Sequence, residues 1–192
     1  MRRLGAFEAK STVGGLLDRV EGGAAIVINR RGKPTRGIAS NIYCRRSPRT
    51  PRCRPSVSFV LDSSMARKWA LPDENSAVVD GVFERLLLDG AFVPSRSCLE
   101  VANALLTAER RGRIHATTRT AVRADLRLLP IEIDPETESR AWTSILAMAE
   151  ECRFTTYDAA YLELAERRKI PLATLDQVLT AAARVRNVLV LG

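Results

Sequence analysis

Two acidic residues directly follow short apolar runs of the chain. Asp62 comes after the run 59–61, and Asp176 comes after the run 172–175. Each run is typical of a buried strand, and the carboxyl ends of parallel strands open onto one edge of a sheet, where α/β folds bind their ligands. We therefore expect these two carboxylates to lie at the same edge.

Two further acidic residues are expected close to that edge. Glu100 falls in the first turn of a helix after the expected strand 91–93, and Asp158 falls in the first turn of a helix that begins near Thr156. Four carboxylates in one cleft would repel one another unless a cation neutralised them. Hard divalent ions such as Mg²⁺ prefer oxygen ligands, and an ion held this way can activate water for phosphodiester hydrolysis. Because acidic residues are frequent in this part of the chain, solvated surface acids are the alternative interpretation.

The elements that must position these residues alternate between short apolar runs and amphipathic stretches. This alternation predicts an α/β fold with a central, mostly parallel sheet. The runs expected to form strands are 59–61, 91–93, 131–133, 172–175 and 188–191. The stretches expected to form helices are 64–70, 77–88, 99–110, 135–150, 157–168 and one beginning at 177. Helix 99–110 is indicated by apolar Leu99, Ala102 and Leu106 at helical spacing.

The charge of the chain is unevenly distributed. The 192 residues include 30 Lys or Arg and 22 Asp or Glu, a formal net charge of +8. The basic excess lies before residue 58, and residues 41–57 carry five arginines, three prolines and no acidic residue. Such a composition favours an extended linker over a helix or strand. We therefore expect a small segment at 1–40, a linker at 41–57 and a domain at 58–192.

Several classes of protein are disfavoured by composition. No run of about 18 uncharged apolar residues is long enough to span a membrane, and the first residues lack the apolar core of a signal peptide. The expectation is a cytoplasmic protein without a membrane partner. Four cysteines without a C-x-x-C pair, together with a single histidine, argue against a zinc site and a disulfide framework.

The sequence around the four acidic residues resembles the PIN-domain ribonucleases, in particular the VapC toxins of toxin–antitoxin pairs. The resemblance covers residues 57–192. The matching runs are Phe-Val-Leu-Asp62-Ser-Ser, Leu-Glu100-Val-Ala-Asn-Ala-Leu, Thr-Tyr-Asp158-Ala-Ala-Tyr-Leu-Glu-Leu-Ala and Leu-Ala-Thr-Leu-Asp176. It implies a PIN-like α/β/α sandwich and an endoribonuclease dependent on Mg²⁺ or Mn²⁺, in which the four acids hold metal and activate water.

The same resemblance implies that Ser64, Asn103 and Thr174 support the acids. The spacing agrees, because Asn103 shares a helix face with Glu100 and Thr174 shares a strand face with Asp176. For Ser64 and Asn103, helix capping or surface polarity is the alternative.

Basic and aromatic side chains carry weaker signals. Arg110, Arg111 and Arg113 form a basic patch that could bind an RNA backbone, or could complement the dipole of the preceding helix. The four aromatic residues of the large segment outside its phenylalanines are expected to lie in the core or on a dimer face and not to stack on bases. They are Trp69, Trp142, Tyr157 and Tyr161.

Residues 1–40 resemble the start of Phd/YefM-type antitoxins. The matching runs are Gly-Ala-Phe-Glu-Ala-Lys10, Leu-Leu-Asp-Arg-Val and Arg-Arg-Gly-Lys-Pro, with a helix expected before Gly22, strands at 25–28 and 36–39, and a turn at 31–34. The resemblance implies a dimer that binds operator DNA, with Arg30, Arg31 and Lys33 as candidate DNA contacts. The match stops near Ser40, before the later helices and the toxin-binding tail of these antitoxins.

An antitoxin-like start followed by a toxin-like nuclease favours a joined pair of genes. We expect the toxin component of a type II toxin–antitoxin system, cleaving RNA and forming a homodimer through its PIN domain. Its protein partner would be a cognate antitoxin or its own N-terminal segment, whose arginines between Arg45 and Arg54 could restrain the acidic site in cis. One alternative is a tail without a role. Another is a DNA-binding autoregulatory fusion in which the PIN domain is mainly a dimerisation scaffold.

Overall fold

The computed structural model describes residues 2–5, 26–30, 33–38, 58–70 and 77–192. These residues belong to two units, a small N-terminal sheet and a larger α/β unit, and each is described by itself.

The larger unit is built on a five-stranded sheet in which every neighbouring pair is parallel. Its order is β6-β5-β4-β7-β8, so the first strand of the unit lies at the centre. The strands are β4 (Phe59–Leu61), β5 (Ala91–Val93), β6 (Ile131–Ile133), β7 (Leu172–Ala173) and β8 (Val190–Leu191). All five expected strands are present, and the parallel α/β fold predicted from the sequence is confirmed.

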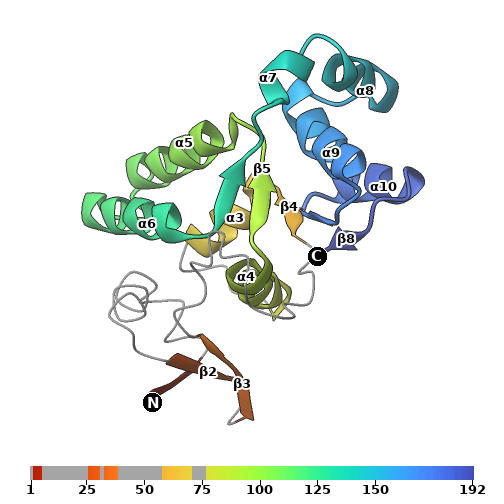
Figure 1. The fold of residues 1–192 in the computed structure, drawn as a ribbon. Coiled ribbons are helices and arrows are strands. Elements are labelled where there is room, and N and C mark those ends of the chain that lie inside the picture. Colours follow the sequence, from red (N-terminus) through yellow and green to blue (C-terminus); the bar gives the residue numbers. More distant parts are fainter. Residues whose placement is uncertain (1, 6–25, 31–32, 39–57, 71–76) are drawn as a thin grey trace. The chain divides into compact units, whose positions relative to one another are not determined.

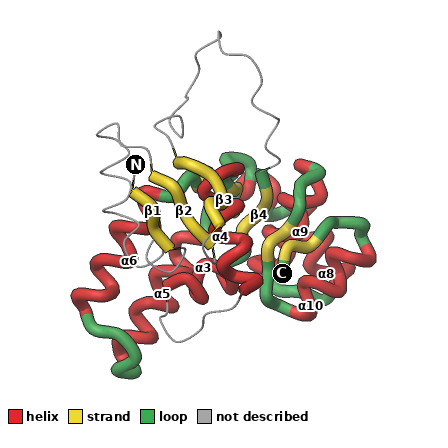
Figure 2. The backbone as a smooth tube through the Cα atoms, turned by 90° about the horizontal axis from the view of Figure 1, so that it is seen from below, coloured by secondary structure: helices red, strands yellow, loops and turns green. Residues whose placement is uncertain are grey.

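Helices cover both faces of this sheet. They are α3 (Ser63–Ala70), α4 (Ala77–Asp89), α5 (Ser97–Arg110), α6 (Ala116–Leu128), α7 (Thr137–Arg140), α8 (Ser144–Cys152), α9 (Thr156–Arg168) and α10 (Gln177–Val185). Figure 1 shows α3 and α5 on one side of the strands and α8, α9 and α10 on the other, and Figure 2 separates the same two groups. Coverage on both faces explains why the strands are continuous apolar runs.

Helix α9 is the central helix of the core. Every residue from Ala159 to Ala165 is buried, and the helix packs on β4, β7, α8 and α10. Its buried Tyr161 and Leu162 belong to the same cluster as Val60 and Leu172 of the central strands. The helix that carries Asp158 is therefore held rigidly against the two strands that end at Asp62 and Thr174.

Two helical predictions need correction. The single helix expected at 135–150 is two helices, α7 and α8, separated by a turn at Ala141–Thr143. Thr143 has φ −124° and ψ −104°, and its hydroxyl donates to the Arg140 carbonyl at 3.3 Å, a local bond that competes with the helix. Helix α6 was not expected; none of its residues is buried, although Val122 packs against the buried cluster of Leu105, Ala108 and Ile114.

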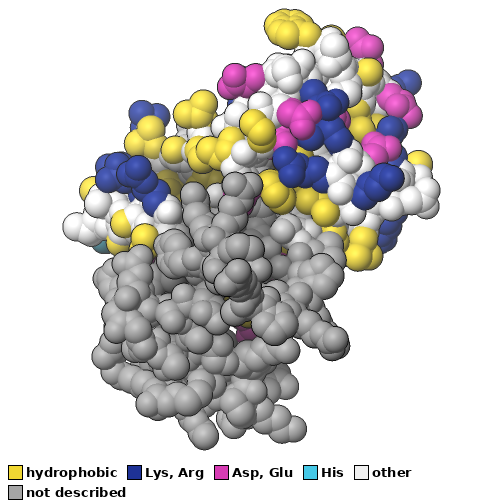
Figure 3. Space-filling model, viewed as in Figure 1, with side chains coloured by type: hydrophobic (Ala, Val, Ile, Leu, Met, Phe, Trp, Pro, Cys, Tyr) yellow, Lys and Arg dark blue, Asp and Glu magenta, His cyan; other side chains and the backbone are white. Residues whose placement is uncertain are grey.

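The apolar residues that predicted helix 99–110 do not form its buried face. The helix is present as α5, but Leu99 and Leu106 are 65% and 36% exposed, and the buried residues of α5 are Ser97, Leu105 and Ala108. Figure 3 shows hydrophobic side chains along the α5 side of the molecule, whereas acidic and basic side chains alternate over α7 to α9.

The N-terminal sheet contains β1 (Arg2–Gly5), β2 (Ile26–Arg30) and β3 (Lys33–Ile38) in the order β1-β2-β3. Strand β2 pairs parallel with β1 and antiparallel with β3. The strands expected at 25–28 and 36–39 overlap β2 and β3, whereas Lys33 and Pro34 of the expected turn lie in β3 and residues 31–32 lie outside the described residues. Strand β1 was not expected. The expected helix before Gly22 and the linker at 41–57 lie outside the described residues, and the domain boundaries stay a prediction.

Within the part of the chain that the structure describes, no helix is both long and apolar enough to cross a membrane.

Candidate active site

Asp62 lies at the carboxyl edge of the central strand β4 and is only 5% exposed. Its backbone N–H donates to the Ala173 carbonyl at 2.9 Å, so the β4–β7 ladder continues one residue past the strands. This pairing brings the Thr174 side chain beside the Asp62 carboxylate. The Thr174 hydroxyl donates to Asp62 Oδ2 at 2.7 Å and is itself 1% exposed.

Ser64 provides the second hydroxyl of this arrangement. Its Oγ donates to the same Asp62 Oδ2 and accepts the backbone N–H of Leu175 at 3.1 Å. Ser64 thus ties the carboxylate to the loop after β7. Two hydroxyl donors compensate for the desolvation of a buried carboxylate. The structure brings the side chains of Asp62, Ser64 and Thr174 together.

Asp176 joins the same chain of contacts through its backbone. Its N–H donates to Thr174 Oγ1 at 3.0 Å, so Thr174 contacts both acids. The Asp176 carboxylate caps α10, where Oδ1 accepts the N–H groups of Val178 and Leu179 at 2.8 and 2.9 Å. An aspartate at this N-cap position stabilises the helix start, and its side chain is fixed beside the β4–β7 edge.

Glu100 approaches the site through the buried phenol of Tyr161. The Tyr161 hydroxyl lies 3.1 Å from Glu100 Oε2 and 3.0 Å from Ser97 Oγ. Because a carboxylate only accepts, the single phenolic proton serves Glu100, and the phenolic oxygen remains available to the Ser97 hydroxyl. Helix α9 in this way fixes the position of an acid on α5.

The pKa of Tyr161 is affected by burial and by two of the acids. Burial raises the pKa of its phenol far above the ordinary value, and the negative charges of Glu100 and Asp62 raise that pKa further. The phenol therefore stays protonated as a donor at any physiological pH. Sequence analysis placed Tyr161 in the core or on a dimer face; it lies in the core, where it contacts a candidate site residue.

Asp158 is held at the first turn of α9 by the N-cap residue of that helix. The Thr155 hydroxyl donates to Asp158 Oδ2 at 2.8 Å and accepts the Asp158 N–H at 3.2 Å. Both bonds use the Thr155 hydroxyl, which caps the start of α9 through the Asp158 N–H and holds the Asp158 carboxylate. Asn103 lies exposed on α5, one helical turn after Glu100.

The donor set is chemically suited to a hard divalent cation. All four predicted ligands are carboxylates and the nearest neutral donors are hydroxyls, which is the oxygen chemistry that Mg²⁺ and Mn²⁺ prefer. Among the described residues, no three His, Cys, Asp or Glu side chains gather closely enough to hold an ion. The arrangement consists of two joined parts, Asp62 with Thr174 and Asp176, and Glu100 with Tyr161. The assignment of the four acids as ligands stays a prediction.

The candidate nucleic-acid contacts have different environments. Arg110 ends α5, and Arg111 and Arg113 follow it; all three are exposed. Arg30 ends β2 and Lys33 begins β3, whereas Arg31 lies outside the described residues. The RNA and DNA contacts assigned to these residues remain predictions.

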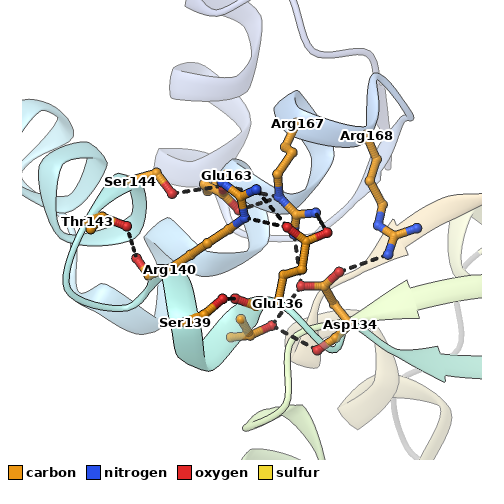
Figure 4. Close-up of polar contacts among 10 residues, drawn as sticks. Asp134, Glu136, Ser139, Arg140, Thr143, Ser144, Glu163, Arg167 and Arg168 are labelled. Atoms are coloured by element: carbon orange, nitrogen blue, oxygen red, sulfur yellow. Dashed lines mark hydrogen bonds and ion pairs between the residues drawn. The ribbon is translucent and has the colours of Figure 1, made fainter.

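One polar cluster was missed by the sequence analysis. Asp134 directly follows β6, as Asp62 follows β4, and is 1% exposed. Its carboxylate pairs with Arg167 at 2.8 Å and with Arg168 at 2.9 Å. Figure 4 shows these two arginines reaching it from the end of α9. Burial raises the pKa of Asp134, but hydrogen bonds and charge from both arginines outweigh this and hold the pKa below its ordinary value.

The cluster extends along α7 and α9. Arg167 also bonds Glu163 at 3.2 Å and Glu136 at 3.1 Å, and Arg140 bonds Glu136 at 2.7 Å. This network joins the end of β6 to α7 and α9. Paired charges at i and i+4 on α9, Glu163 and Arg167, were a signal in the sequence for part of it.

Comparisons with known protein families match most of the larger unit to one of them. A family model described as PIN domain matches residues 59–185, well over half of the chain. The chain belongs to the PIN-domain family. PIN domains are generally nucleases and often occur in toxin–antitoxin systems.

Two solved structures are similar to the chain. PAE2754 from Pyrobaculum aerophilum is 23% identical with a TM-score of 0.53, over 71% of this chain and 85% of that one. FitAcB from Neisseria gonorrhoeae is 15% identical with a TM-score of 0.51, over 70% of this chain and 96% of that one. These likenesses concern the fold. No curated protein sequence matches the chain.

Proposed function

We propose that the protein is a metal-dependent endoribonuclease, the VapC-like toxin component of a type II toxin–antitoxin system. The observation that carries the proposal is the buried Asp62 carboxylate at the carboxyl edge of β4, held by two hydroxyls beside Asp176. A carboxylate fixed in this way is preorganised for a cation, because the side chain loses little conformational entropy when the ion binds.

In this proposal Asp62, Glu100, Asp158 and Asp176 hold Mg²⁺ or Mn²⁺. A bound ion of this kind activates water and stabilises the leaving oxygen of a phosphodiester. The chain itself contributes the positioning. Thr174 and Ser64 orient Asp62, the Tyr161 phenol orients Glu100, and the caps of α9 and α10 fix Asp158 and Asp176. Substrate RNA would contact the exposed arginines at 110, 111 and 113 through its phosphates.

The decisive experiment measures cleavage of total cellular RNA by the full chain with and without Mg²⁺. We expect cleavage that requires the ion and that Asp62→Asn lowers by about 10²-fold or more, the scale on which catalytic acid–base groups contribute. Glu132→Gln, a change at an exposed acid of β6, is the matched control and should keep wild-type activity. Cleavage that survives Asp62→Asn would refute the assignment and would favour the DNA-binding scaffold.

We further propose that the protein is cytoplasmic, pairs with a cognate antitoxin or with its own basic N-terminal segment, and dimerises through the PIN domain. The five arginines at 45, 46, 49, 52 and 54 are tethered to the acidic site, which gives them a high effective concentration there. Replacing all five by glutamine in the full chain should raise RNA cleavage. Unchanged activity would show that the segment does not restrain the site.

A further inference from the structure

Two aromatic side chains near the acidic site are exposed and do not serve the core. Trp142, in the turn between α7 and α8, is 85% exposed, and Tyr157, in the first turn of α9, is 45% exposed. These exposures exclude the core, one of the two placements expected for Trp142 and Tyr157, and leave the dimer face as the other. A tryptophan with most of its surface in water presents a large apolar face that is free to stack.

Both side chains line one pocket of about 500 Å³. It lies between the start of α5, helices α7 and α8, and the start of α9, and its floor includes Ile145 and Ala160. The volume falls within the range of roughly 300–1,000 Å³ typical of sites for small organic groups. A single nucleobase is a group of suitable size and shape.

The rim of the pocket carries a stacked cation. The Arg96 guanidinium lies over the Tyr157 ring, 4.6 Å from its centroid, and Arg96 is exposed. Proteins recognise unpaired RNA bases by stacking them on aromatic rings and on guanidinium planes. Arg96 and Trp142 provide one plane of each kind at the same pocket, and the charge of Arg96 suits a neighbouring phosphate.

The carboxylates of the pocket favour a base over a phosphate in its interior. Glu100 and Glu138 both line it, and two negative charges disfavour an anionic group between them. A neutral base has N–H groups along its edge, and carboxylates accept such donors. Arg96 thus suits the phosphate of a nucleotide, and Glu100 and Glu138 suit the N–H groups of its base.

One candidate site residue lines the pocket: Glu100, whose carboxylate also contacts the Tyr161 phenol. We propose that this pocket is a subsite for one unpaired base of a single-stranded RNA substrate, with Trp142 stacking on the base and Arg96 contacting its phosphate. The proposal rests on the proposed ribonuclease function. It assigns to Trp142, Tyr157 and Arg96 a role in selecting unpaired RNA next to the cleaved bond.

The test measures binding without cleavage. The full chain is titrated into a fluorescein-labelled single-stranded RNA 12-mer of mixed sequence, in EDTA, and fluorescence anisotropy is recorded. Base–aromatic stacking contributes enough that Trp142→Ala should weaken binding roughly 5-fold to 100-fold. Trp142→Phe, which keeps a stacking ring, should recover most of the affinity. Val185→Ala, at an 83% exposed residue of α10, is the matched control and should bind as the wild type does.

A duplex of the same sequence separates stacking from charge. Trp142→Ala should leave duplex binding unchanged, because paired bases cannot enter the pocket, whereas Arg96→Gln should weaken single-strand binding. Equal affinity of wild type and Trp142→Ala for the single strand, or no binding by the wild type, overturns the proposal. So does a Trp142→Ala variant that binds RNA normally but loses self-association in sedimentation, which would make this face an interface between copies.

The two proposals fail separately. RNA binding that depends on Trp142, without ion-dependent cleavage, supports the subsite and contradicts the ribonuclease. Cleavage that depends on Asp62 but is unaffected by Trp142→Ala, with unchanged binding, supports the ribonuclease and overturns the subsite.

Discussion

The Thr174 hydroxyl donates to Asp62 Oδ2 at 2.7 Å although the two residues are 112 positions apart in the chain. The contact exists because β4 and β7 are adjacent in the sheet while α3 to α9, together with β5 and β6, lie between them in sequence. The central acid of the candidate site therefore depends on closure of the sheet centre.

Thr174→Val keeps the shape of the side chain and removes its hydroxyl. The Asp62 carboxylate, which is only 5% exposed, then loses one donor, and the Asp176 N–H loses its acceptor. We expect a loss of about 1–3 kcal/mol in the free energy of unfolding, measured by urea denaturation. The control is Thr120→Val, which removes an exposed hydroxyl bond to Ala116 and should change stability by less than about 0.5 kcal/mol. Similar losses in both variants would contradict the prediction.

Tyr161→Phe removes the phenolic donor to Glu100 and keeps the ring in the core. Because Tyr161 positions a predicted metal ligand without touching substrate, we expect RNA cleavage to fall about 10-fold to 100-fold, as for other partners of ligating groups. The deficit should shrink as the Mg²⁺ concentration rises, which a merely structural role would not produce. Glu132→Gln, a change at an exposed acid of β6, is the control and should have little effect on cleavage. Wild-type cleavage by Tyr161→Phe would remove the tyrosine from the mechanism.

Arg167→Met tests the network at the end of β6. The variant leaves the buried Asp134 with Arg168 as an ion-pair partner and with the Thr137 hydroxyl, and breaking a buried ion pair costs on the order of 3 kcal/mol. Arg140→Met, at the more exposed side of the same network, should cost less than about 1 kcal/mol. The free energy of unfolding of both variants is measured by urea denaturation at neutral pH. Equal, small losses in both would show that the Arg167–Asp134 pair does not stabilise the fold.

The same network makes stability depend on pH in a defined direction. The pKa of Asp134 is lower in the folded chain than its ordinary value of 3.8, so the folded state releases this proton more readily than the unfolded state. The stabilisation is complete above the ordinary pKa and is lost as the pH falls through the lowered one. Arg167→Met should therefore lose less stability than the wild type between about pH 7 and about pH 3. An equal loss of stability in the wild type and in Arg167→Met would show that the Asp134–Arg167 pair does not cause the pH dependence.

Saturating Mg²⁺ should stabilise the full chain if the acids bind it. A ligand at 100 times its dissociation constant adds about 2.7 kcal/mol, which for a chain of this size raises the melting temperature by several degrees. Thermal unfolding should show this rise in the wild type and in Glu132→Gln, and a much smaller rise in Asp62→Asn. A rise of equal size in all three would locate the ion elsewhere.

The sequence predicted most of the fold because burial leaves a strong pattern. The strands 59–61 and 91–93 are apolar throughout, and the structure gives them the same bounds. Helix α6 was not predicted from the sequence, and it differs from these strands in that none of its residues is buried. The break between α7 and α8 depends on a local hydroxyl bond of Thr143, which no periodicity reveals.

The sequence indicated which candidate site residues lie at the edge of the sheet, but not which side chains contact one another there. Proximity of Asp62 to Thr174 followed from the parallel sheet, but the role of Tyr161 did not, because it depends on which face α9 turns toward Glu100. Asp134 shows the limit of the argument from position. It follows its strand just as Asp62 does, yet two arginines at the end of α9 neutralise it, and that pairing depends on the crossing of α9 over the sheet.

The separation of Asp62 and Thr174 also sets an order of events during synthesis. A ribosome makes the arginines between Arg45 and Arg54 shortly before Asp62, whereas Thr174 follows Asp62 only 112 positions later. Domains fold as their sequence becomes available. A growing chain therefore carries its basic segment well before Asp62 and Thr174 can come into contact.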